Sequence, residues 1–125
     1  MHIKSMELAW IVVKDLKKAI KFYTETMGLK LMEQHDAYGW AELQGHEGGA
    51  RLGIAQVSDK ESVQPGSNAI VTLTVESIEE ALEGFKKKGV KLLGDVQEVP
   101  GHVKMQSVVD SDGNQFQLVE KLADF

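Results

Sequence analysis

The chain has 125 residues, of which 42% are hydrophobic and 26% are charged, so its length and composition are those of a single globular domain with a buried core. Its net charge is −5 and its basic residues are scattered, which argues against a nucleic-acid surface. It has no cysteine, which excludes disulfides, thiolate metal sites and a cysteine nucleophile.

No membrane or export segment is expected from the sequence. No apolar run approaches the roughly 18 residues of a membrane span. Residues 1–5 lead directly into predicted structure and lack the pattern of a secretory signal. We therefore expect a cytoplasmic protein without a membrane partner.

The first half of the chain is typical of a strand, a helix and three further strands. Residues 8–13 form a short apolar strand, and Asp15 is a suitable N-cap for the helix that follows it. Further strands are predicted at residues 29–34, 39–43 and 50–57. The helix carries apolar side chains at helical spacing and is followed by a glycine that ends it: Leu16, Ala19, Ile20, Tyr23 and Gly28.

The second half repeats this pattern. Residues 72–95 can be laid over residues 11–33 so that Val13 matches Val75, and Gly28 matches Gly89 because the second copy has one residue fewer between these two points. Ser77 to Glu80 forms a capping box at the start of the second helix. The helix then presents Ile78, Ala81, Leu82 and Phe85 before Gly89, and strands are predicted at 90–96, 103–109 and 114–120.

These elements predict a single domain of class α+β, made of two tandem β-α-β-β-β modules. Module one spans 6–57 and module two spans 69–121. A polar linker at 58–68, which contains Pro65-Gly66, joins them. A curled mixed sheet built this way turns alternate residues of each strand toward a shared cavity.

Two stretches resemble the glyoxalase / bleomycin-resistance / dioxygenase superfamily, also called vicinal oxygen chelate (VOC) proteins. Residues 12–31 (VVKDLKKAIKFYTETMGLKL) are similar to the strand-to-helix opening of that family. Residues 108–121 (VVDSDGNQFQLVEK) resemble its D-P-D-G-N-x-x-E-L ending, with Ser111 in place of the proline. The resemblance covers roughly residues 6–121 and implies a glyoxalase-like fold and a homodimer.

The resemblance also implies where metal enzymes of the family place their ligands. Carried over by register, these positions are Leu8, Gly53, Ile70 and Gln117, of which only Gln117 offers an oxygen. A divalent cation needs several converging donors, so we expect no metal and no cofactor. The chain has four histidines, His2, His35, His46 and His102. His46 and His102 remain candidate ligands of a non-standard metal site.

The strand faces that carry these positions present apolar, hydroxyl and amide groups, which suit a small organic ligand. The indole rings of Trp10 and Trp40 add flat contact surface. Lys104 would meet an anionic group if its strand face points inward, and is an ordinary surface lysine if it points outward. The predicted ligand-binding residues are Leu8, Trp10, Trp40, Ile70, Thr72, Lys104, Gln115 and Gln117.

The leading hypothesis is therefore a metal-independent member of this superfamily that binds a small molecule, with sites at or near a subunit boundary. The alternative is a metal-dependent lyase or isomerase of the lactoylglutathione lyase (glyoxalase I) type. Leu8 and Ile70 argue against it, because their apolar side chains cannot bind the metal. A ring-cleaving dioxygenase ranks behind it, because it needs two histidines and a carboxylate around iron. A non-catalytic regulatory subunit is the fourth hypothesis. The sequence does not name the ligand or the catalytic residues.

Overall fold

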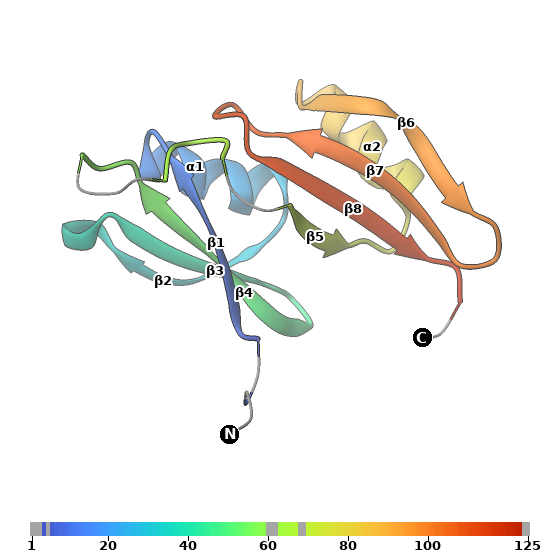
Figure 1. The fold of residues 1–125 in the computed structure, drawn as a ribbon. Helices are drawn as coiled ribbons and strands as arrows, with labels where there is room; N and C mark the ends of the chain where they lie inside the picture. Colours follow the sequence, from blue (N-terminus) through green and yellow to red (C-terminus); the bar gives the residue numbers. More distant parts are fainter. Residues whose placement is uncertain (1–3, 5, 60–62, 68–69, 124–125) are drawn as a thin grey trace. The chain divides into compact units, whose positions relative to one another are not determined.

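The chain is α+β and consists of two tandem modules, each with a four-stranded mixed sheet (Figure 1). A computed structural model describes residues 4, 6–59, 63–67 and 70–123. The chain divides into two compact units, Met1–Asn68 and Ala69–Phe125. No helix in these described ranges has the length and apolar character needed to cross a membrane.

In the first unit, one helix connects the first strand to the second, and the three strands after the helix follow one another as antiparallel neighbours. Its sheet has the order β1-β4-β3-β2, in which β1 is parallel to β4 and the other neighbours are antiparallel. The elements are β1 (Leu8–Val13), α1 (Leu16–Lys21), β2 (Lys30–His35), β3 (Trp40–Gly45) and β4 (Gly48–Gln56).

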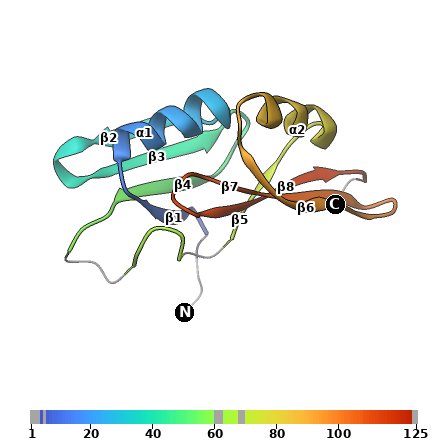
Figure 2. The same ribbon diagram turned by 90° about the horizontal axis from the view of Figure 1, so that it is seen from above.

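Helix α1 lies against one face of this sheet, next to β3 and β4 (Figure 2). Alternate residues of each strand point to this face, which is why the strands alternate between buried and more exposed positions. The side chains buried there form the core of the unit: Ile11, Val13, Leu16, Ala19, Tyr23, Ala41, Leu43, Leu52 and Ile54. Helix α1 does not cover the opposite face of the sheet.

The first helix differs from the prediction in its last turns. It was expected to run as one α-helix toward Gly28, but α1 ends at Lys21 and continues as a π-helical turn, η1 (Phe22–Thr26). The Met27 amide donates to the Phe22 carbonyl at 3.0 Å, five residues back. The Thr24 hydroxyl donates to the Ile20 carbonyl at 2.8 Å, and such a hydroxyl competes with the regular helical ladder.

The second unit repeats the topology of the first. Its sheet has the order β5-β8-β7-β6, with β5 parallel to β8, and its helix lies against β7 and β8 (Figure 2). Its buried core consists of Ile78, Leu82, Phe85, Val108, Phe116 and Leu118. The elements are β5 (Val71–Thr74), α2 (Ile78–Lys87), β6 (Lys91–Val99), β7 (Val103–Val109) and β8 (Gln115–Lys121).

Candidate functional site

The face of the first sheet opposite α1 collects side chains from all four strands. Across β1 and β4, Leu8 is opposite Arg51 and Trp10 is opposite Gly53, and across β3 and β4, Glu42 is opposite Gly53. Residues directly opposite each other point to the same side of a sheet. We call this surface the tryptophan face, and by strand register it comprises Leu8, Trp10, Val12, Lys30, Glu33, His35, Trp40, Glu42, Gln44, Arg51, Gly53 and Ala55.

Trp10 and Trp40 form a pair above Gly53. Their ring centroids are 6.3 Å apart and their planes are inclined at 60°. A Cβ atom on Gly53 would lie 2.4 Å from Cη2 of Trp40 and 2.9 Å from Cβ of Trp10, closer than such atoms approach in proteins. Gly53 has no positive φ, so its role here is steric: the missing side chain leaves room for the Trp40 indole.

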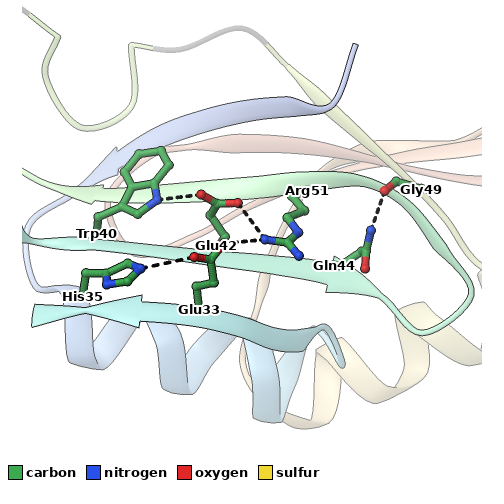
Figure 3. A network of polar contacts seen from close by, with 7 residues as sticks. All are labelled: Glu33, His35, Trp40, Glu42, Gln44, Gly49 and Arg51. Atoms are coloured by element: carbon green, nitrogen blue, oxygen red, sulfur yellow. Dashed lines mark hydrogen bonds and ion pairs between the residues drawn. The ribbon is translucent and has the colours of Figure 1, made fainter. Parts of the chain in front are cut away.

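A chain of polar contacts holds the edge of this indole (Figure 3). Nε1 of Trp40 donates to Oε2 of Glu42 at 3.0 Å. Nη1 of Arg51 donates to Oε1 of Glu42 at 3.1 Å and to Oε2 of Glu33 at 2.5 Å. Nε2 of His35 lies 3.3 Å from Oε1 of Glu33. The contacts therefore connect β4, β3 and β2 across the tryptophan face.

In this network of polar contacts, the carboxylates of Glu33 and Glu42 share the guanidinium group of Arg51. The indole N–H of Trp40, and after it Arg51, lowers the pKa of Glu42. The hydrogen bond to Glu42 raises the pKa of Arg51 in turn. Because Glu33 and Glu42 together carry one negative charge more than Arg51 neutralises, the group has an excess of negative charge when both are ionised.

A pocket of about 740 Å³ lies on the same unit. It shares Leu8, Glu42 and Arg51 with the tryptophan face, so the indole pair stands next to it along the same strands. Its volume is within the range of small-molecule sites, roughly 300–1,000 Å³. Its lining residues are Met6, Glu7, Leu8, Glu42, Gln44, Gly49, Ala50 and Arg51.

From the sequence, Leu8, Trp10 and Trp40 were proposed as ligand-binding residues, but the polar residues that lie beside them on this face were not. Glu33 reaches Arg51 because the register of β2 shifts between Leu31 and Glu33. Glu42 and Arg51 were detectable in principle, since each is two residues from a position already assigned to the same side of its strand. The pairing of β3 with β4 was the missing information.

The candidates of the second unit divide between two faces of its sheet. Thr72 is opposite Gln117, and Gln117 is opposite Ser107, so these share a face with Gln115. The Thr72 hydroxyl donates to Oε1 of Gln117 at 3.4 Å, and Nε2 of Gln115 donates to Oγ of Ser107 at 3.3 Å. Ile70, directly before β5, is 56% exposed.

Lys104 lies on the other face, the one that packs against α2. Its Nζ is 2.7 Å from Oε1 of Glu79 on that helix. Its strand neighbour on the same side, Gln106, is buried and donates to the carbonyls of Leu93 and Gly94. Lys104 therefore does not join Thr72, Gln115 and Gln117, and its charge is already paired within the unit.

Next to Gln117 there is a small recess of about 90 Å³. Nε2 of Gln117 donates weakly to Sδ of Met105 at 3.7 Å. The volume is sufficient for a few water molecules, not for a drug-sized ligand. Its lining residues are Leu93, Gly94, Asp95, Gln97, Met105, Gln106, Ser107 and Gln117.

The residues at the positions that the family resemblance implies for metal ligands do not fit a divalent cation. Leu8 and Gly53 offer no donor side chain, and the Trp40 indole occupies the space beside Gly53. Across the described part of the chain, no three His, Asp or Glu side chains are grouped so that they could hold a metal. His46 has Nε2 2.9 Å from the Gly28 carbonyl, and His2 lies outside the described residues.

Comparisons with known proteins agree with this fold. A crystal structure of a member of the glyoxalase/bleomycin resistance protein/dioxygenase superfamily from Sphaerobacter thermophilus has a TM-score of 0.81 at 24% identity, and the match covers 95% of this chain and 98% of that one. TnmS3, an antibiotic binding protein from Streptomyces sp. CB03234, has a TM-score of 0.81 at 24% identity, covering 97% and 98%. A glyoxalase/bleomycin resistance protein from the same Streptomyces has a TM-score of 0.77 at 25% identity, covering 91% and 98%.

The family assignment comes from the sequence match. No curated protein matches the chain. The model of the Glyoxalase/Bleomycin resistance protein/Dioxygenase superfamily matches residues 2–118. That match spans nearly all of both modules, and the chain therefore belongs to the Glyoxalase/Bleomycin resistance protein/Dioxygenase superfamily.

Proposed function

We propose that the chain binds a small organic ligand on the tryptophan face, without the metal site of the family's metal enzymes. The observation that carries this proposal is the indole pair of Trp10 and Trp40, held above Gly53 beside a pocket of about 740 Å³. A partly exposed aromatic surface next to a concave pocket supplies both stacking area and enclosure.

The ligand we propose has a flat ring and is neutral or cationic. Trp10 is 37% exposed, so part of its ring surface is available for stacking. Arg51 is engaged with both Glu33 and Glu42, and among the described residues that line the pocket it is the one cation. An anionic ligand would have to displace a carboxylate from Arg51, whereas a cation meets the two carboxylates of the pocket lining, Glu7 and Glu42, and the neighbouring indole rings.

Fold similarity supports ligand binding only in general terms. TnmS3 is an antibiotic binding protein, and its 24% identity to this chain carries the fold and not the ligand. A homodimer, which the family resemblance implies, is part of the proposal. The lyase alternative finds no support at Leu8 or Gly53, where a metal enzyme would need donor side chains.

The proposal is tested with three flat dyes of different charge: cationic proflavine, neutral acridone and anionic anilinonaphthalene sulfonate. Both tryptophans of the chain belong to the proposed site, so intrinsic fluorescence reports on it directly. We expect saturable binding of proflavine and acridone, measured by calorimetry and by tryptophan quenching. Binding of the sulfonate dye is expected to be weaker.

Substitution of Trp10 localises the binding. Trp10→Ala removes one stacking surface and should weaken proflavine binding about 10-fold. Val99→Ala is the matched control, because it removes exposed apolar surface from β6 in the other unit. Equal affinity in Trp10→Ala and the unaltered protein, or no saturable binding of any dye, would contradict the proposal.

A further inference from the structure

The position of the Trp40 indole is determined from two sides. Below it, Gly53 leaves the space that its ring occupies, with a hypothetical Cβ only 2.4 Å from Cη2. At its edge, Glu42 accepts the indole N–H at 3.0 Å. A ring held by a steric floor and a directional hydrogen bond has little freedom to rotate about its side-chain torsions.

Glu42 is itself held in place. Its second carboxylate oxygen, Oε1, accepts a hydrogen bond from Nη1 of Arg51 at 3.1 Å. The same Nη1 also donates to Oε2 of Glu33 at 2.5 Å. The side chains of Arg51 and Glu42 are 33% and 21% exposed, so the sheet shields the pair in part. Charge-assisted bonds of this kind are shorter and stronger than neutral ones, and a network of them restricts each member.

We propose that Gly53 and Glu42 are the specificity-determining and positioning residues for Trp40, which they hold, with Arg51 and Glu33, as a preorganised stacking surface for the flat ring of the ligand. This inference rests on the proposed function. A preorganised ring avoids the entropy cost of ordering an indole on binding, so loss of the arrangement weakens stacking. Gly53 thus acts through the ring it admits, and Glu42 through the ring it orients.

The arrangement has a spectroscopic signature that does not require a ligand. Two indoles at 6.3 Å and 60° couple their electronic transitions, and this coupling produces an exciton couplet in far-ultraviolet circular dichroism. Trp10→Phe removes one partner, which assigns the couplet to this pair. A substitution that only destabilises the fold lowers the melting temperature without displacing Trp40 from Trp10 in the folded protein.

Gly53→Ala and Glu42→Leu are the test variants. The first places a methyl group where Trp40 lies, and the second removes the acceptor of its N–H. Gly84→Ala is the matched control, since Gly84 has no positive φ and a Cβ there meets nothing within 4 Å. If Gly53→Ala does not fold, Glu42→Leu carries the test by itself.

We expect both test variants to lose most of the couplet and to bind proflavine about 10-fold more weakly, while Gly84→Ala matches the unaltered protein in both measurements. An unchanged couplet in both variants overturns the inference. A lost couplet with unchanged dye affinity also overturns it and leaves the proposed function standing. The third outcome is that the two test variants lose the couplet while neither they nor the unaltered protein bind any of the dyes. This outcome supports the positioning of Trp40 and contradicts the proposed function.

Discussion

Glu42 is the residue on which the arrangement of the tryptophan face depends most directly. One carboxylate oxygen accepts from the Trp40 indole and the other from Arg51. Both contacts favour the ionised carboxylate, which is why they lower its pKa from the ordinary value of 4.5. Protonation would remove the charge that Arg51 pairs with and leave one oxygen as a donor.

The pH dependence of stability follows from the sign of this pKa change. Since the pKa of Glu42 is lower in the folded chain than in the unfolded chain, ionised Glu42 stabilises the fold above the unfolded pKa. This contribution is lost as the pH falls from about 4.5 through the folded pKa. We expect Glu42→Gln to reduce the acid dependence of the urea midpoint in that window, measured by tryptophan fluorescence.

Glu83→Gln is the control for this measurement. Glu83 pairs with Lys87 on the exposed surface of α2, with side chains 73% and 76% exposed, and such pairs contribute little to stability. Its pH profile should follow that of the unaltered protein. An acid profile of Glu42→Gln identical to that of Glu83→Gln would show that Glu42 gains nothing from its contacts.

At the scale of elements, α2 shows how a helix is tied to its sheet at its first turn. The Ser77 side chain accepts from the Glu80 amide at 3.3 Å, as the capping box predicts. The carboxylate of Glu120, at the end of β8, accepts from the Ile78 amide at 2.7 Å. Two amides that the helix itself leaves without partners are thereby satisfied, one locally and one from the sheet.

Removing the local cap tests this account. Ser77→Ala should lower the free energy of unfolding by about 1 kcal/mol, because the Glu80 amide loses its acceptor. Urea denaturation followed by circular dichroism measures the change. Ser111→Ala, in the exposed turn before β8, is the matched control and should change stability little. Equal loss in both variants would mean that the hydrogen bond to Ser77 has no stabilising role.

At the scale of the whole molecule, one topology is used twice with different surfaces. The orders β1-β4-β3-β2 and β5-β8-β7-β6 are the same arrangement, as the internal repeat predicts. In the aligned positions, Trp10 of the first module corresponds to Thr72 of the second. Their strand partners, Gly53 and Gln117, also differ: the first makes room for an indole and the second accepts from a hydroxyl.

This difference leads to a prediction about metals. The positions that the family resemblance implies for metal ligands are Leu8, Gly53, Ile70 and Gln117. They supply a single oxygen-bearing side chain, fewer donors than a divalent cation requires. After dialysis against zinc, nickel, manganese or iron(II), we expect metal content far below one ion per chain and an unchanged melting temperature. Plasma mass spectrometry and thermal unfolding give these values.

Chelator-treated protein is the reference for both measurements. One tightly held ion per chain, with a raised melting temperature, would contradict the prediction and make His46 and His102 the first ligands to test by substitution.

The positions of most strands and the starts of both helices could be predicted from the sequence. Asp15 and Ser77 accept from backbone amides three residues ahead, as their residue types and spacing indicate. The end of the first helix could not be predicted, because the π-helical turn depends on the Thr24 hydroxyl and on packing of Tyr23 in the core. Nor did the alternation at Lys104 and Gln106 say which face of β7 would meet α2.

By itself, the sequence determined the two modules, their α+β class and the apolar stripes that form their cores, because these depend on local periodicity and repeat length. Only the tertiary structure decided the polar half of the site. β2 has a single extra residue between Leu31 and Glu33, and this shift places Glu33 opposite Glu42. Glu33 therefore lies on the side of the sheet where it reaches Arg51. Cross-strand register is a long-range property, set by how whole strands pair, and no local pattern around Glu33 specifies it.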